Sequence, residues 1–161
     1  MVFVAWIVVT PGHALPMKLR VGEPWMPARD YGRSLKALTI NLLVRNVDKA
    51  LQFQREVLST EVVYSDPDFA VMRGYGAEWM LHADHSYQGH AMEIVLGGAG
   101  QRGAGAELRL HGCDPDRAEQ SARRLGFKVL VATTDKLHGL REAYLVDADG
   151  YVWVPDVPVE I

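Results

Sequence analysis

The sequence contains one supersecondary pattern twice. Residues 46–50 (NVDKA) align with residues 114–118 (DPDRA), and residues 76–80 (GAEWM) align with residues 150–154 (GYVWV). A repeat of this size indicates duplication of one folding unit. Each unit has a sheet with one face covered by its own helix, so the other face needs a partner. This repeat constrains the fold more than any other feature of the chain.

The first copy reads as a strand, a capped helix and three short strands. Apolar and polar side chains alternate from Ala37 to Val44, which predicts a strand with two distinct faces. Asn46 is a favourable cap for the helix that follows it. The remaining strands are predicted at residues 60–65, 69–74 and 78–82.

The second copy repeats this order. Residues 107–111 alternate, Asp114 caps a helix with Pro115 in its first turn, and Gly126 ends that helix. Strands are predicted at residues 127–132, 141–147 and 150–154. The predicted fold is therefore α+β, with two tandem βαβββ modules forming a curved, partly barrel-like sheet around a cavity.

The chain divides into four segments in this interpretation. They are an N-terminal arm (1–36), a first module (37–82), a glycine-rich connector or lid (83–104) and a second module (105–157). The apolar residues 1–10 are too few to span a bilayer and lack the basic start of a secretory signal. An extra edge strand, a flexible arm and a start at Met17 all remain open, and we favour the last two together.

Charge and cysteine content restrict the partners. The chain has 17 basic and 20 acidic residues and a net charge of -3, so it has no basic excess to neutralise nucleic-acid phosphates. Nothing in the pattern predicts a membrane span. The single cysteine, Cys113, excludes an intrachain disulfide and favours a reducing, cytoplasmic location.

The motifs that carry the repeat resemble a known family. The helix starts NVDKALQF and DPDRAEQSARRLG and the closing stretch REAYLVDADGYVWVP are similar to those of the glyoxalase/bleomycin-resistance/dioxygenase family, the vicinal oxygen chelate superfamily. The resemblance covers about residues 37–157. It implies paired βαβββ modules, often completed in a dimer. It also implies either a metal-dependent lyase, isomerase, epimerase or dioxygenase, or a metal-free protein that sequesters drugs.

The resemblance places the family's metal ligands on the first and last strands of each module. The matching positions are Thr39, Met80, Glu107 and Val154, of which only Glu107 is an ordinary ligand for a divalent metal. We therefore expect no metal or other cofactor, with Zn, Ni, Fe or Mn as the alternative. His82, His85 and His90 form a second candidate metal set, but a polar surface loop explains them equally simply.

The alternation of the strands also predicts which side chains face the cavity. The candidate ligand-binding residues on the sheets are Thr39, Asn41, Met80, His82, Glu107, Arg109, His111 and Val154. Trp25 from the arm, Tyr87 from the connector and Arg141 before the seventh strand are further candidates. Arg141 has an alternative role, as an ion-pair partner of Asp147 or Asp149. Trp79 and Trp153 alternate with the cavity-facing positions of their strands. They therefore lie on the opposite face of the sheet and are expected to pack beneath the helices.

Two classes of function remain open at this point. The favoured one is a small-molecule-binding protein that sequesters a drug-like or metabolite ligand in the cavity between the modules, without a metal. The alternative is a lyase, isomerase or dioxygenase-like enzyme, for which Glu107 and His82 are the weak catalytic candidates. A simple ion pair between Glu107 and Arg109 competes with that role. In either case we expect a homodimer, because each module has edge strands that need covering.

Overall fold

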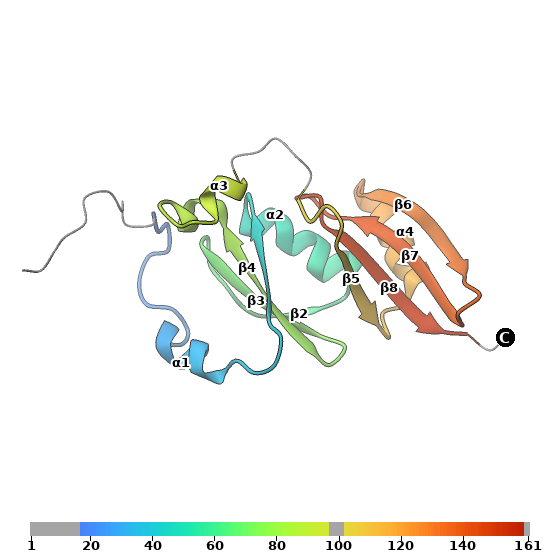
Figure 1. The fold of residues 1–161 in the computed structure, drawn as a ribbon, viewed down its shortest axis with the longest axis horizontal. Helices are drawn as coiled ribbons and strands as arrows, with labels where there is room; N and C mark the ends of the chain where they lie inside the picture. The colour runs from blue at the N-terminus through green and yellow to red at the C-terminus, as the bar shows by residue number, and fades with distance from the viewer. Residues whose placement is uncertain (1–16, 97–101, 160–161) are drawn as a thin grey trace, which may run out of the picture.

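The computed structural model describes residues 17–96 and 102–159, which contain two four-stranded sheets (Figure 1). The first sheet has the order β1-β4-β3-β2 and the second has the order β5-β8-β7-β6. β1 pairs with β4 in parallel, as β5 does with β8, and all other neighbours are antiparallel. This is the predicted pair of βαβββ modules, and within the described residues neither sheet closes into a barrel.

The strand bounds follow the predicted order closely. The strands of the first module are β1 (Ile40–Val44), β2 (Glu61–Ser65), β3 (Phe69–Gly74) and β4 (Ala77–Ala83). Those of the second module are β5 (Glu107–His111), β6 (Lys128–Asp135), β7 (Leu140–Val146) and β8 (Val152–Pro158). β8 runs past the predicted end at residue 154. The pairing of β8 with β7 continues on both sides of Pro155, a residue with no N–H to donate.

The predicted caps set the helix ends. Asn46 Oδ1 accepts a hydrogen bond from the Lys49 N–H at 2.9 Å and starts α2 (Val47–Gln52), which continues as a π-helix, η1 (Phe53–Val57). Asp114 caps α4 (Pro115–Leu125) by accepting from two backbone N–H groups. Gly126 ends α4 with a φ of 78°, a left-handed conformation that glycine adopts without steric cost. The π-helical turn is a feature that the periodicity did not predict.

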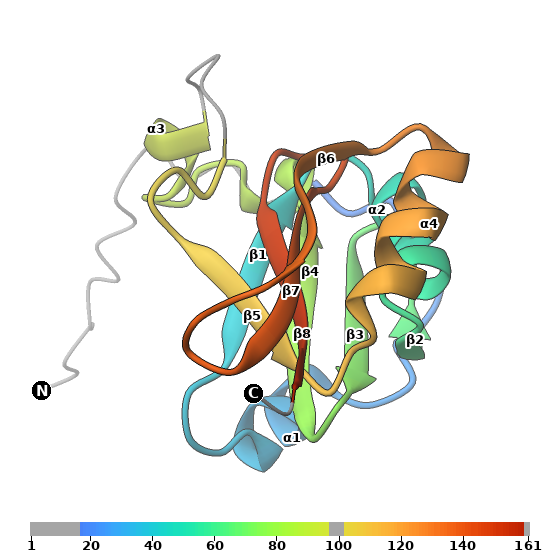
Figure 2. The same ribbon diagram turned by 90° about the vertical axis from the view of Figure 1, so that its right-hand side faces the viewer.

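The two modules share one core. α2 and α4 lie on the same side of the two sheets (Figure 2). Beneath them the Trp79 and Trp153 rings lie 5.5 Å apart, and Phe53 meets Phe127 edge-on at 5.0 Å. Both tryptophans are buried, which confirms the phase predicted for them. The repeat therefore builds a single apolar core and not two independent ones.

The arm covers the other face of the first sheet. It contains a short helix, α1 (Ala28–Ser34), whose Tyr31 is buried against Phe69 with the ring centroids 5.7 Å apart. The N–H groups of Leu19 and Arg20 both donate to the Asp68 carboxylate, at 2.7 and 3.2 Å. The arm is thus held at both ends, as expected for its large apolar residues. The predictions for residues 1–16 lie outside the described part of the chain.

The connector is partly helical. It contains η2 (Asp84–Tyr87), a turn of 3-10 helix, and α3 (Glu93–Leu96). Arg102 at its far end pairs with Asp84 at 2.5 Å and donates to the Leu43 carbonyl at 2.6 Å, which fastens the connector to the first sheet. Over residues 17–96 and 102–159, no helix is both long and apolar enough to cross a membrane.

Candidate functional site

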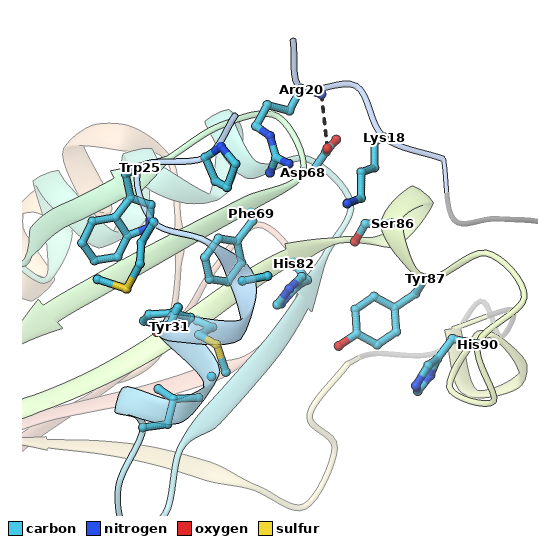
Figure 3. Close-up of a pocket in the computed structure, with 16 residues that line it drawn as sticks. Lys18, Arg20, Trp25, Tyr31, Asp68, Phe69, His82, Ser86, Tyr87 and His90 are labelled. Atoms are coloured by element: carbon cyan, nitrogen blue, oxygen red, sulfur yellow. Dashed lines mark hydrogen bonds between the residues drawn. The ribbon is translucent and has the colours of Figure 1, made fainter. Parts of the chain in front are cut away.

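A cavity of about 460 Å³ lies between the arm and the concave face of the first sheet (Figure 3). Its floor is formed by side chains of β3 and β4, its opposite wall by the arm, and one end by η2. The lining residues on which the argument depends are Trp25, Tyr31, Phe69, Met80, His82 and Tyr87. Four candidates from the sequence therefore meet in one place, namely Trp25, Met80, His82 and Tyr87.

Aromatic rings form most of the apolar surface of the cavity. Trp25 stacks on Tyr64 at 5.8 Å and tilts against Tyr31 at 6.0 Å. The Tyr31 hydroxyl donates to Glu78 at 3.3 Å. Burial, assisted by the nearby Glu78 carboxylate, raises the pKa of Tyr31 to about 12, so its hydroxyl stays protonated at neutral pH. These contacts hold the arm wall at a defined place above the sheet.

A hydrogen-bonded row joins two lining residues of the cavity, His82 and Tyr87, through Asn41, which does not itself line the cavity. His82 Nδ1 lies 2.7 Å from Asn41 Oδ1, and Asn41 Nδ2 donates to the Tyr87 hydroxyl at 2.7 Å. The His82 ring also packs on Phe69, with the centroids 4.5 Å apart. Burial lowers the pKa of His82 to about 4, so the imidazole is uncharged at neutral pH. Asn41 belongs to β1, His82 to β4 and Tyr87 to η2, so the fold brings together three elements.

The rim of the cavity is polar, and two of its charged side chains, Arg20 and Asp68, have charged or ionisable partners. Arg20 pairs with Asp66 at 3.2 Å, and Asp68 accepts from His85 at 2.8 Å as well as from the arm backbone. Burial of Asp68 acts to raise its pKa. The hydrogen bonds from His85, Leu19 and Arg20 outweigh that effect and leave the pKa below its usual value. Asp68 therefore joins the arm to the sheet as a carboxylate.

A second hollow of about 490 Å³ lies between the modules and collects other predicted residues. Thr39, Glu107 and Arg109 line it. Glu107 pairs with Arg109 at 3.3 Å, the ion pair that competed with a catalytic role. Arg109 also contacts Glu142 and lies 3.3 Å from Asp156, and both of these carboxylates are buried. The structure thus makes Arg109 the centre of an ion network on the second sheet.

The remaining candidates line neither hollow. Val154 is fully buried, and the His111 side chain is mostly exposed with its Nδ1 2.7 Å from Asp156. Arg141 pairs with Asp116 at 2.6 Å and with Asp135 at 2.7 Å. The alternative partners expected for Arg141, Asp147 and Asp149, are wrong, because the end of β6 and the start of α4 come next to the start of β7 in the fold.

The family's metal-ligand positions do not form a ligand set. Met80 lines the first cavity, Thr39 and Glu107 line the second hollow, and buried Val154 has no donor atom. Across the described residues, no three His, Cys, Asp or Glu side chains gather in a way that could hold a metal ion. His82 and His85 bond to Asn41 and Asp68, respectively. The residues present do not fit the divalent metal that the fold family implies.

Several residues of the two sites were not predicted. Phe69 lines the first cavity, and Glu142 and Asp156 surround Arg109. Phe69 pairs directly with His82 between β3 and β4, so the strand register would have revealed it once the turn between those strands was placed. The buried carboxylates gave no such signal, because acidic residues in strands are usually exposed.

Comparison with solved structures identifies the fold. A glyoxalase-related enzyme from Fulvimarina pelagi aligns with a TM-score of 0.60 at 16% identity over 76% of this chain and 87% of the other. A glyoxalase/bleomycin resistance protein/dioxygenase family enzyme from Burkholderia phytofirmans PsJN aligns with a TM-score of 0.62 at 15% identity, over 75% and 97%. The fosfomycin resistance protein FosX from Listeria monocytogenes aligns with a TM-score of 0.55 at 15% identity, over 78% of this chain and 94% of the other.

Identities this low show a common fold, and the chain has the fold of the glyoxalase/bleomycin-resistance/dioxygenase proteins, the vicinal oxygen chelate fold. No family model and no curated protein sequence matches the chain. The fold predicted from the repeated motifs is therefore confirmed by three-dimensional similarity alone.

Proposed function

We propose that this chain binds a small, largely apolar molecule without a metal, in the cavity between the arm and the first sheet. The sequence instead predicted a ligand site between the modules, where the second hollow lies. The observation that carries the proposal is the cavity itself: about 460 Å³, walled by aromatic rings, with few polar groups on its floor. This volume lies in the range of pockets that hold drug-sized ligands. Among the similar structures, FosX is named as a fosfomycin resistance protein and two others are named as enzymes, so these names support a small-molecule site but do not distinguish sequestration from catalysis.

The test is a binding titration of the purified protein with bleomycin and a set of planar aromatic antibiotics, measured by calorimetry. Trp25 is about half exposed in the arm, so Trp25→Ala should leave the fold intact. It should weaken binding of any compound that enters the cavity at least tenfold, through loss of aromatic contact area. Leu130→Ala, at an exposed site on β6, is the matched control and should bind as the wild type does. Equal affinity of Trp25→Ala and the wild type would place the ligand elsewhere.

The enzyme alternative is less well supported by the geometry. His82 and Glu107, its two catalytic candidates, line different hollows, and Glu107 is paired with Arg109. An acid and a base must both reach the reacting atoms. Turnover of a small carbonyl or catechol substrate, or stoichiometric metal in protein purified without a histidine tag, would favour the enzyme and overturn the proposal.

Two further expectations stay part of the proposal. We propose that the protein is a homodimer, because β2 and β6 end their sheets and β1 and β5 border the hollow between the modules. We also propose a cytoplasmic location and no nucleic-acid or membrane partner. A monomer in sedimentation at micromolar concentration would contradict the first of these.

A further inference from the structure

We propose that His82 and Tyr87 together recognise a neutral ligand group that both donates and accepts a hydrogen bond, such as a carboxamide or a lactam. The inference rests on the proposed function and specifies the ligand class of the same cavity. It starts from the row His82–Asn41–Tyr87, in which Asn41 bonds to both neighbours at 2.7 Å. Figure 3 shows His82 and Tyr87 side by side, facing the same space, and their ring centroids lie 5.5 Å apart.

Asn41 forces its two neighbours to present opposite polarity to the cavity. Its amide oxygen can only accept and its amide nitrogen can only donate. With the oxygen toward His82, Nδ1 carries the imidazole proton and Nε2 is left as an acceptor. The amide nitrogen then donates to Tyr87 Oη, so the Tyr87 O–H is left to donate.

Rotating the Asn41 amide by half a turn exchanges the roles of His82 and Tyr87. The number of donors and acceptors that the two residues offer to the cavity stays the same. Nδ1 then accepts, so Nε2–H becomes the donor, while Tyr87 donates to Asn41 and its oxygen accepts from the ligand. In both orientations the cavity offers one donor and one acceptor. Within residues 17–96 and 102–159, neither His82 Nε2 nor the Tyr87 hydroxyl has a further hydrogen-bond partner.

The charge state of the row favours a neutral ligand group at this point of the cavity. The His82 imidazole is half-buried and uncharged, so it gives no ion pair to a carboxylate or phosphate, and Lys18, which also lines the cavity, does not belong to the row. A carboxylate can only accept, and it would leave one member of the pair unsatisfied; an amidinium can only donate and has the same defect. Because an unmet hydrogen bond in a buried site lowers affinity roughly ten- to hundredfold, the site should prefer an amide over either ion.

Three naphthalene derivatives of matched shape test this preference: 2-naphthamide, 2-naphthoate and 2-naphthamidine, titrated by calorimetry at pH 7. In the wild-type protein, 2-naphthamide should bind at least tenfold more tightly than either ion. Asn41→Asp provides an acceptor to both neighbours, so both His82 and Tyr87 then donate to it and present acceptors to the cavity. This variant should prefer 2-naphthamidine, with at least a tenfold reversal of the order.

Two controls separate this effect from general disturbance of the protein. Asn46→Asp makes the same chemical change at the exposed cap of α2, outside the cavity, and should keep the wild-type order. Tyr87→Phe keeps the ring but removes the hydroxyl, and should bring 2-naphthamide and 2-naphthoate to within about threefold.

The outcomes distinguish this inference from the proposed function. If all three compounds bind equally and Trp25→Ala weakens all of them, the cavity binds ligands but the row does not select among them, which overturns the inference alone. If none of the three binds, both proposals fail for this class of compound. An unchanged order of affinities in Asn41→Asp would also overturn the inference.

Discussion

His82 shows how one buried side chain couples the cavity to pH. Burial lowers its pKa to about 4, against the opposing influence of Asp66. In the unfolded chain the group titrates near 6.5, so between these values the unfolded state binds more protons than the folded state. The folded state therefore loses stability as the pH falls from about 6.5 to about 4, and the full contribution of neutral His82 is present above that window.

The variant His82→Gln should remove this dependence. Between pH 7 and pH 5, we expect the free energy of unfolding of the wild type to fall by about 2 kcal/mol more than that of the variant. Urea denaturation followed by circular dichroism at both pH values measures the difference. If the free energy of unfolding changes equally with pH in the wild type and in His82→Gln, then His82 is protonated in the folded state. The statement that His82 is uncharged in the cavity would then be wrong.

At the scale of elements, Asp68 is one of the residues that join the arm to the first sheet. This buried carboxylate accepts from the backbone of Leu19 and Arg20 and from His85. The same hydrogen bonds outweigh burial and lower its pKa, so their stabilisation is present at neutral pH and is lost only as the pH falls through that lowered pKa. The cavity wall formed by Trp25 and Tyr31 depends on this attachment.

Replacing Asp68 with Ala should release the arm. Without this acceptor, the Leu19 and Arg20 N–H groups are unpaired when the arm lies on the first sheet. This weakens the attachment of the arm by about 1–3 kcal/mol. We expect trypsin to cleave after Arg29 and Arg33 at least tenfold faster, as followed by mass spectrometry. Asp30→Ala, which removes a half-exposed carboxylate within the arm itself, should leave the cleavage rate near that of the wild type. Similar rates in both variants would show that other contacts hold the arm.

At the scale of the whole molecule, the two modules depend on one core. Trp79 of the first module and Trp153 of the second are in ring contact, and Phe53 of the first packs on Phe127 of the second. Each tryptophan also has a polar partner: Trp79 donates to buried Gln54 and Trp153 donates to half-buried Asp147. A substitution that destabilises the core of one module should therefore also destabilise the other module.

Trp153→Ala should destabilise both modules together, by about 3–5 kcal/mol. Hydrogen exchange tests this directly: amides of β3 and β4, which lie entirely in the first module, should lose protection in parallel with those of β7 and β8. Leu130→Ala, at an exposed position on β6 of the second module, serves as the control and should leave protection unchanged. Retained protection in β3 and β4 would show that the modules unfold independently.

Local features of the chain were predictable from the sequence because they depend on near neighbours. The alternation of β5, the caps Asn46 and Asp114 and the helix end at Gly126 all follow from side-chain spacing and backbone preference. The alternation predicted for residues 37–44 is wrong, because β1 begins at Ile40 and its last three residues are all buried. The repeat also determined the phase of Trp79 and Trp153, since two copies of one unit bury corresponding positions. The candidate residues of β1, β4, the arm and the connector were likewise identified in advance, but as separate positions.

Only the tertiary structure decided which of these residues meet. It placed the arm across the first sheet, so that Trp25, His82 and Tyr87 share a cavity while Glu107 and Arg109 lie in another hollow. It also paired Arg141 with Asp116 and surrounded Arg109 with buried carboxylates. The reason is physical: periodicity reports which face of an element is buried, whereas the partner across that face comes from a segment far away in the chain.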